Sequence, residues 1–255
     1  MSRIVGYPQL VLVLCLVTLW LSAQIGASFR KRRQNLEEDD REDLSVVKSA
    51  SLTLLGLIIG FSFSMASNLY DQRKNCEEAE TNAIGTEYLR ADFLPAADAA
   101  RVRTLLRNYL DQRVLFYESH DDGQLRQIDA ATAQLQADLW SAVQAPAAAK
   151  PTPMVALAVS GMNDVLNSQG YTQAAWWNRI PFEAWGLMVT IAICCNLLIG
   201  YGARGGGAKA ILLLVLPLIV SISFFLIADI DSPRGGIVRV RPQNLVSLSQ
   251  SLPAL

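Results

Sequence analysis

A regular series of small and polar residues runs along one apolar segment of the chain. Successive members are three or four residues apart, a spacing that places them on one face of an α-helix. They are Ser49, Thr53, Gly56, Gly60, Ser64, Ser67 and Asp71. In a membrane, hydroxyl groups need hydrogen-bond partners, so such a face meets either another helix or water. The series therefore predicts either close helix packing through Gly56-x-x-x-Gly60 or the wall of an aqueous pore.

As a pore wall, this face would offer the hydroxyls of Ser64 and Ser67 to a passing ion, and Phe61 and Phe63 are candidates for an apolar constriction. The candidate pore-lining residues are therefore Gly56, Gly60, Phe61, Phe63, Ser64, Ser67 and Asp71. No ring of charged residues lies at mid-span, so the segment by itself predicts no charge selectivity.

Charged residues gather directly after this segment and again after the last apolar stretch. The first group is Asp71, Arg73, Lys74, Glu77, Glu78 and Glu80. Paired carboxylates can perform acid–base chemistry, but cations at helical spacing favour salt bridges on a solvated helix face. In the second group, Asp229 and Asp231 could coordinate a cation. The following Ser232-Pro233 favours instead a helix that ends there.

Residues for enzymatic or metal chemistry are otherwise sparse. His120 is the only histidine, and the four cysteines form no CxxC pair. No glycine-rich phosphate loop or nucleophile elbow is present. We therefore expect no enzymatic activity, no cofactor and no metal site. The net charge of −1 also argues against nucleic acid as a partner.

Four apolar stretches are long enough to span a bilayer or nearly so. They are Leu10–Ala27, Val46–Leu69, Trp185–Ala203 and Ala210–Ala228. The first could be a signal peptide, but the Arg-Lys-Arg-Arg run that follows it favours a membrane span. Trp176, Trp177 and Trp185 are expected at interfacial depth. A tight Arg204–Gly207 link makes spans three and four a predicted hairpin.

The second span continues without a turn signal into a charged sequence that reaches Asp92. One helix from Ser49 to Asp92 would be ~66 Å long at ~1.5 Å per residue, about twice the hydrocarbon thickness. Leu94-Pro95 ends it, because proline disfavours a helical conformation at the preceding residue.

The polar region that follows shows helical periodicity throughout. We predict helices from Asp98, as N-cap, to Ser119, over Gln124–Ala145 and over Met154–Trp177. A turn at His120–Gly123 and a break at Pro146, Pro151 and Pro153 would separate them. The tail Ile237–Leu255 has only weak periodicity.

The predicted fold class is an all-α, four-span integral membrane protein. A helical extramembrane domain lies between spans two and three, and the second span continues as a long helix. The expected divisions are 1–45 (first span and charged loop), 46–92 (second span and stalk), 93–180 (helical domain), 181–230 (hairpin of spans three and four) and 231–255 (tail).

Several segments resemble the bacterial bestrophin-like domain proteins, a family of integral membrane proteins. They are LLGLIIGFSFSMA, YDQRK, TNAIGTEYLRADFLP, RNYLDQRVLFY and IADIDSPRGGIVRV, within about residues 46–245. True bestrophins are homopentameric anion channels with four spans, a long second helix and a cytoplasmic helical domain. The resemblance implies a channel, a pentamer and a bacterial inner-membrane location. No bestrophin neck or calcium-clasp motif is matched here, so no functional residue is carried over.

Charge and family likeness predict opposite orientations. The loops 28–45 and 204–209 hold Arg30, Lys31, Arg32, Arg33, Arg41, Arg204 and Lys209. The positive-inside rule places these loops in the cytoplasm and the helical domain outside, whereas the resemblance places that domain in the cytoplasm. Labelling of Cys76 by an impermeant maleimide, in intact and then permeabilised cells, distinguishes the two.

The sequence therefore predicts a homo-oligomeric ion channel in the lipid bilayer, lined by the second span and conducting inorganic ions, with anions implied by the resemblance. The alternative is a non-conducting sensor or scaffold whose helical domain recruits a partner.

Overall fold

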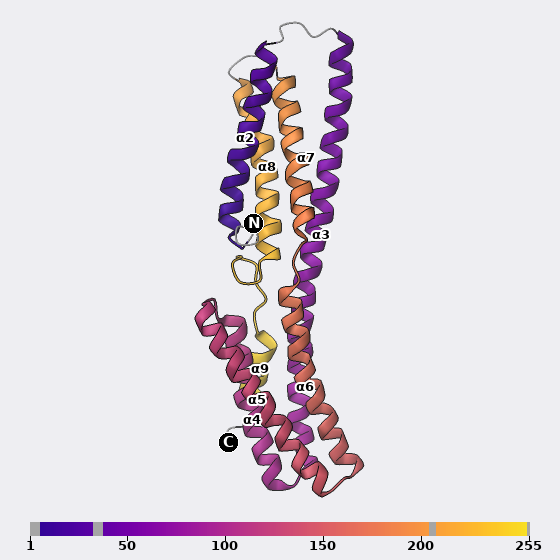
Figure 1. Ribbon diagram of the computed structural model, residues 1–255, viewed down its shortest axis with the longest axis vertical. Coiled ribbons are helices and arrows are strands. Elements are labelled where there is room, and N and C mark those ends of the chain that lie inside the picture. Colours follow the sequence, from indigo (N-terminus) through magenta and orange to yellow (C-terminus); the bar gives the residue numbers. More distant parts are fainter. Residues whose placement is uncertain (1–5, 33–37, 204–207, 254–255) are drawn as a thin grey trace. The chain divides into compact units, whose positions relative to one another are not determined.

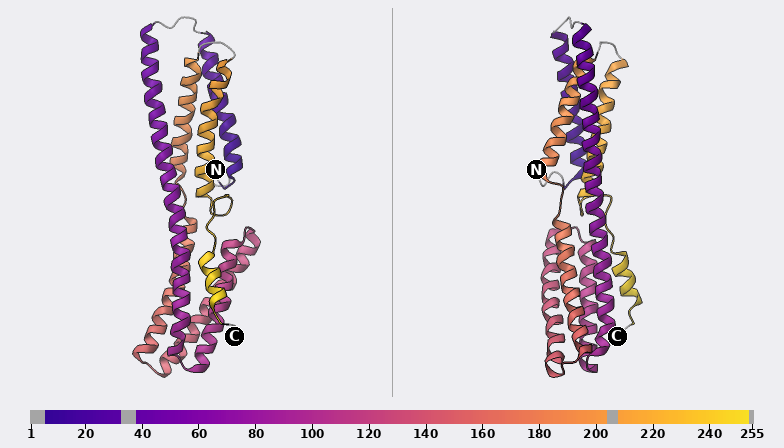
Figure 2. Two further views of the ribbon diagram at one scale, coloured as in Figure 1. Left: turned by 180° about the vertical axis from the view of Figure 1, so that it is seen from behind. Right: turned by 90° about the vertical axis from the view of Figure 1, so that its right-hand side faces the viewer.

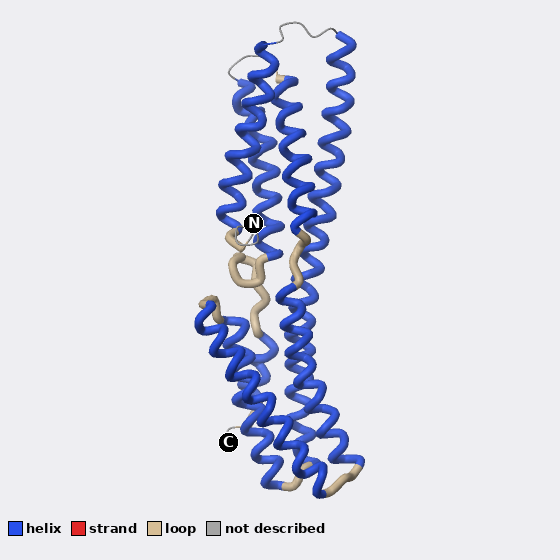
Figure 3. Tube along the Cα trace, viewed as in Figure 1, coloured by secondary structure: helices blue, strands red, loops and turns tan. Residues whose placement is uncertain are grey.

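The computed structural model describes the backbone of residues 6–32, 38–203 and 208–253 (Figure 1). Within these ranges the chain is helical and contains no strand, which confirms the all-α prediction (Figure 3). The helices are α2 (Pro8–Arg32), α3 (Glu38–Arg90), η1 (Ala91–Phe93), α4 (Ala96–Glu118), α5 (Asp122–Ala149), α6 (Pro153–Trp177), α7 (Phe182–Gly202), α8 (Ala208–Asp231) and α9 (Gln243–Ser251).

The four-span prediction is confirmed. In the part of the chain that the structure describes, four helices are long and apolar enough to cross a membrane. These spans lie in α2, α3, α7 and α8. The predicted link Arg204–Gly207 lies outside the described residues.

The second span is confirmed as part of one unbroken helix. α3 has 53 residues and begins at Glu38, well before the expected start at Ser49. The single 3₁₀ turn η1 follows it, and Leu94 is extended with ψ of 160°. Pro95 explains this end, because the residue before a proline avoids the helical region.

The contacts divide the chain into two compact units. The first comprises residues 1–70 and 179–239, and the second comprises 71–178 and 240–255. The division falls within α3, so the first part of this helix belongs to one unit and the second part to the other. Figure 2 shows both from two further sides.

A close helix crossing holds α2 against α7 in the first unit. A Cβ at Gly26 would overlap the backbone carbonyl oxygen of Leu197, and a Cβ at Gly200 would overlap that of Ala23. Only glycine lets two backbones approach this closely, which is the small-residue packing expected between membrane helices. The apolar core of this unit includes Met188 and Phe224, both 0% exposed, and the polar side chains of Asn196 and Ser221 are buried in the same unit, also at 0%.

The second unit packs α4, α5 and α6 with the later part of α3 (Figure 2). The apolar face of α4 is buried at Val102, Leu106, Tyr109, Leu110 and Phe116. Aromatic rings close one end of this core, where Phe116, Tyr117 and Trp176 make edge-on contacts with centroids 5.0 to 5.6 Å apart.

Three local predictions were wrong: the start of the second helix at Gln124, the break at Pro146, and Asp98 as an N-cap. α5 starts at Asp122, capped by Asp121, and runs through Pro146 to Ala149. A proline this near the helix end loses little, and the alanines around it favour helix. α4 is capped by Pro95, with Asp98 in its first turn rather than at the cap.

The tail contains a helix, α9, that its weak periodicity did not indicate. Its N-cap residue Pro242 makes no side-chain capping bond. Instead, the carboxylate of Glu77 on α3 accepts hydrogen bonds from the backbone N–H groups of Asn244 (2.9 Å) and Leu245 (3.0 Å). A carboxylate there satisfies the free donors of the first turn and complements the helix dipole.

The glycine crossing generates a prediction about folding. Gly200→Val should lower the thermal unfolding midpoint of the detergent-purified protein, since overpacking typically costs about 1–3 kcal/mol and the atom in the way here is backbone. Gly186→Val on the same helix is the matched control, because a Cβ there meets nothing within 4 Å. Equal midpoints for the two variants would contradict this account of the crossing.

Candidate pore-lining face

The small and polar face of α3 is not covered by any other described part of the chain. Ser49, Thr53, Gly56, Gly60 and Ser64 are all exposed, and Ser67 is half-buried. A Cβ at Gly56 or Gly60 would meet nothing within 4 Å. The Gly56-x-x-x-Gly60 pair therefore packs against no described helix of its own chain. The glycine packing of this fold occurs at Gly26 and Gly200 instead.

The opposite face of α3 is the one that contacts the other spans. Leu55, Ser62 and Ala66 are buried, at 2%, 8% and 0% exposure. At about 100° per residue, these three lie about 120–160° around the helix from Gly60. Only 6% of the most apolar stretch of α3 is buried within the chain, against 50% of the corresponding stretch of α8. One side of α3 therefore holds the unit together, and its small-residue side is free.

Phe61 and Phe63 flank the free face on opposite sides. They are 65% and 41% exposed. Two residues along an α-helix differ by about 160° in direction, so both rings cannot point at one axis. Phe63 lies about 60° from Gly60 and Phe61 about 100°. Phe63 is therefore the better placed of the two for an apolar constriction.

Near the start of the free face, the hydroxyl of Thr53 is hydrogen-bonded within its own helix. Thr53 donates its hydroxyl hydrogen to the carbonyl oxygen of Ser49 at 3.0 Å. Such bonding to the preceding turn is usual for threonine in membrane helices. The oxygen of this hydroxyl can still accept a hydrogen bond from water or contact a cation, whereas an anion would need the hydroxyl hydrogen, which is already donated.

The charged group after the span is not the solvated face that was predicted. Asp71, Lys74 and Glu78 are exposed, but Arg73, Glu77 and Glu80 are 1%, 1% and 0% exposed. Buried charges must be paired or hydrogen-bonded, and each of the three is. Within the second unit, this group holds helices together.

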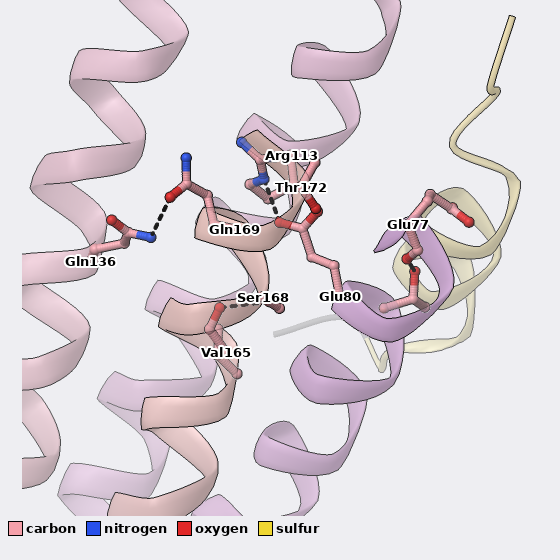
Figure 4. A network of polar contacts seen from close by, with 9 residues as sticks. Glu77, Glu80, Arg113, Gln136, Val165, Ser168, Gln169 and Thr172 are labelled. Atoms are coloured by element: carbon pink, nitrogen blue, oxygen red, sulfur yellow. Dashed lines mark hydrogen bonds and ion pairs between the residues drawn. The ribbon is translucent and has the colours of Figure 1, made fainter. Parts of the chain in front are cut away.

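Arg73 and Glu80 fasten different helices to α3. Arg73 donates to the carbonyl oxygens of Ala175 (3.2 Å) and Asn178 (2.9 Å), near the end of α6. Glu80 accepts from Arg113 of α4 at 2.5 Å and from Thr172 of α6 at 3.1 Å (Figure 4).

Arg113 is the principal buried residue that sequence reasoning missed. It is 0% exposed, and its guanidinium lies 4.4 Å from the centroid of the Phe116 ring. Burial lowers the pKa of Arg113, but the charge of Glu80 and the hydrogen bond to it oppose this effect, and the net shift of the Arg113 pKa is upward. The signal was present, because Arg113 lies four residues after Tyr109 and three before Phe116, on the apolar face of the predicted helix.

Glu87 is the least compensated buried acid in the second unit. It is 0% exposed, and neither carboxylate oxygen has a hydrogen-bond partner in the described structure. Its side chain and that of Arg90 lie against Gly161 of α6, where a Cβ would overlap both. Burial raises the pKa of Glu87 to about 8, with Arg90 opposing the shift and Asp164 adding to it. Most Glu87 side chains are therefore protonated at pH 7.

Asp229 and Asp231 organise backbone at the end of α8. Asp229 accepts from the N–H groups of Ile237 (2.7 Å) and Val238 (2.8 Å). Asp231 accepts from the N–H of Ile180 at 3.0 Å and lies 4.0 Å from Arg179. α8 ends at Asp231, as Ser232-Pro233 predicts. Among the described residues no cluster of three or more His, Cys, Asp or Glu could hold a metal ion.

These features define a class: an all-α, multi-span membrane protein with a long second membrane helix and a separate helical unit. The chain belongs to the bestrophin-like family, because the Bestrophin-like domain matches residues 13–245. Comparison with curated proteins gives no match.

Solved structures show the same fold. A bacterial bestrophin homolog from Klebsiella pneumoniae, in a form with a tyrosine replaced by alanine, superposes with a TM-score of 0.66 at 12% identity. The alignment covers 94% of this chain and 99% of that one. A second structure of the homolog from the same organism gives 0.65 at 13% identity, covering 95% and 98%. The earlier resemblance to this family is thus confirmed.

The raised pKa of Glu87 predicts the direction of a pH effect. A carboxyl whose pKa is higher in the folded than in the unfolded state binds its proton preferentially when folded. Its contribution to the free energy of unfolding therefore falls as the pH rises from its unfolded value of about 4.3 towards 8. Glu87→Gln, which carries no charge at any pH, should flatten the decline in thermal midpoint over that range. Glu78→Gln, at an exposed position of α3, should leave the decline unchanged, and equal slopes for both variants would contradict this role of Glu87.

Proposed function

We propose that the chain is a subunit of a homo-oligomeric ion channel, with the free face of α3 turned towards an aqueous axis shared between copies. The observation that carries this proposal is that a stripe of small and hydroxyl-bearing residues lies within the side of α3 that no other described helix covers, with exposed apolar residues such as Leu57 and Phe61 beside it. In hydrocarbon that arrangement leaves polar groups without partners, whereas water at an axis supplies them.

The alternative is a non-conducting assembly in which this face packs dry against another copy. Gly56 and Gly60 would suit such packing. The exposed hydroxyl of Ser64 then needs a partner from the neighbour, whereas that of Thr53 already donates its hydrogen to Ser49. Because water satisfies every member of the face without a matching sequence opposite it, we favour the aqueous axis.

We further propose a pentamer in the bacterial inner membrane that passes inorganic anions, following the properties of bestrophins. The span itself carries no charge between Lys48 and Asp71. Any preference for anions must then come from hydroxyl and backbone dipoles, from the constriction at Phe63, or from charges outside the span.

The proposal predicts that blocking the face stops conduction. Ser64→Trp should abolish current through the purified protein in planar bilayers, because a bulky ring from each copy would fill the axis. Met65→Trp is the matched control, since Met65 is the next residue, 43% exposed, and about 100° away around the helix. It should conduct normally.

Both variants should keep the wild-type thermal midpoint and oligomeric mass, since neither position is buried within the chain. Undiminished current in Ser64→Trp would contradict the pore lining. A wild-type protein that is silent in bilayers and monomeric in detergent would contradict the channel itself.

A further inference from the structure

A cavity of about 390 Å³ lies within the first unit, between α2, α7 and α8. Its lining includes Leu14, Cys15, Trp185, Gly186, Thr190 and Phe224. Its volume is within the range of small-molecule sites. No described side chain of α3 lines it, so the cavity is separate from the candidate pore-lining face.

The surroundings of the cavity limit what can enter it. Its lining belongs to three membrane-spanning helices, so the medium at its mouth is the bilayer. Leu14 and Phe182 both line the cavity and are 49% and 56% exposed. The mouth of the cavity is therefore apolar and opens towards lipid. The described residues of the lining include no charged side chain, which disfavours an ion and favours a hydrocarbon chain.

One polar group within the lining lacks a partner. Trp185 is only 7% exposed, and its indole Nε1 has no hydrogen-bond partner in the described structure. A buried tryptophan normally finds an acceptor for this N–H, and leaving it unpaired costs about 1–3 kcal/mol. α7 begins at Phe182, so Trp185 lies one turn from the end of its span. That is the interfacial depth where tryptophan is enriched and lipid headgroups begin.

We propose that this cavity binds one acyl chain of a bilayer phospholipid, with an ester carbonyl oxygen of that lipid accepting the Trp185 N–H. The chain supplies the apolar contacts and the ester supplies the missing acceptor. This site does not depend on conduction and would exist in a silent assembly as well.

Gly186 provides the variant that tests this site. It lines the cavity, and a Cβ there meets nothing within 4 Å. Gly186→Leu therefore places a branched side chain into open space without displacing backbone. Leu187→Phe is the matched control, because Leu187 is 53% exposed and does not line the cavity. The thermal midpoint of each variant checks that folding is intact.

The probe is a phospholipid with a diazirine midway along one acyl chain, present in trace amount in liposomes that contain the full-length protein. After irradiation, peptide mass spectrometry locates the adducts. We expect adducts within residues 11–19 and 182–190 of the wild type, reduced several-fold in Gly186→Leu and unchanged in Leu187→Phe. Trp185→Phe should lower the yield of adducts in the same two segments, because the phospholipid probe then loses the hydrogen bond to its ester.

Three outcomes would overturn the proposal. Equal labelling of wild type and Gly186→Leu would mean contact with bulk lipid alone. Stronger labelling by a free fatty acid that carries the same diazirine would assign the cavity to fatty acids rather than phospholipid. Adducts absent from both segments would mean that the cavity is closed by a neighbouring copy.

Discussion

Polar groups in hydrocarbon need a partner, and the account of α3 depends on this constraint. The side of the helix that carries Leu55 and Ala66 is buried against the other spans. The side that carries Gly60 and Ser64 is free in the single chain. A soluble protein could leave such a face in water, but a membrane protein can do so only if the fold brings water to it. An axis shared between copies is the simplest arrangement that does this.

Within the second unit, α3 is the helix to which the others are fastened. Three charged residues, Arg73, Glu77 and Glu80, lie within about two successive turns of α3. Each of them pairs with or hydrogen-bonds to a different helix. Arg73 binds the carbonyl oxygens near the end of α6, Glu77 caps α9, and Glu80 pairs with Arg113 of α4. Removing one member of a buried pair leaves the other charge uncompensated, a cost typically of about 3–5 kcal/mol. These ionic contacts therefore specify which helices pack against α3 and at which positions along it.

The sequence was informative where one pattern extends over many residues. The length of the apolar stretches predicted the four spans, and helical spacing predicted α4 and α6. The absence of turn signals predicted the unbroken α3. Its limits were local. A charge run such as Arg73–Glu80 looks the same whether its partners are water or a helix more than 30 residues away. Arg113 and α9 were missed because their stabilising contacts come from distant parts of the chain, Glu80 and Glu77 respectively. Likewise, the spacing of Gly56 and Gly60 matched a packing motif, whereas the packing glycines, Gly26 and Gly200, lie on two separate helices.

The most direct test of the proposed pore is whether the free face of α3 is in contact with water. Single cysteines at Thr53, Ser64 and Ser67 on this face, and at Leu54 and Met65, about 120° and 140° around the helix from Gly60, can be placed in a protein whose four native cysteines are serine. Their reaction rates with a charged, water-soluble thiosulfonate in proteoliposomes then report exposure to water. An aqueous axis predicts fast modification at 53, 64 and 67 and little at 54 and 65. Uniformly slow modification at all five positions would show that the face is dry and would contradict an aqueous axis.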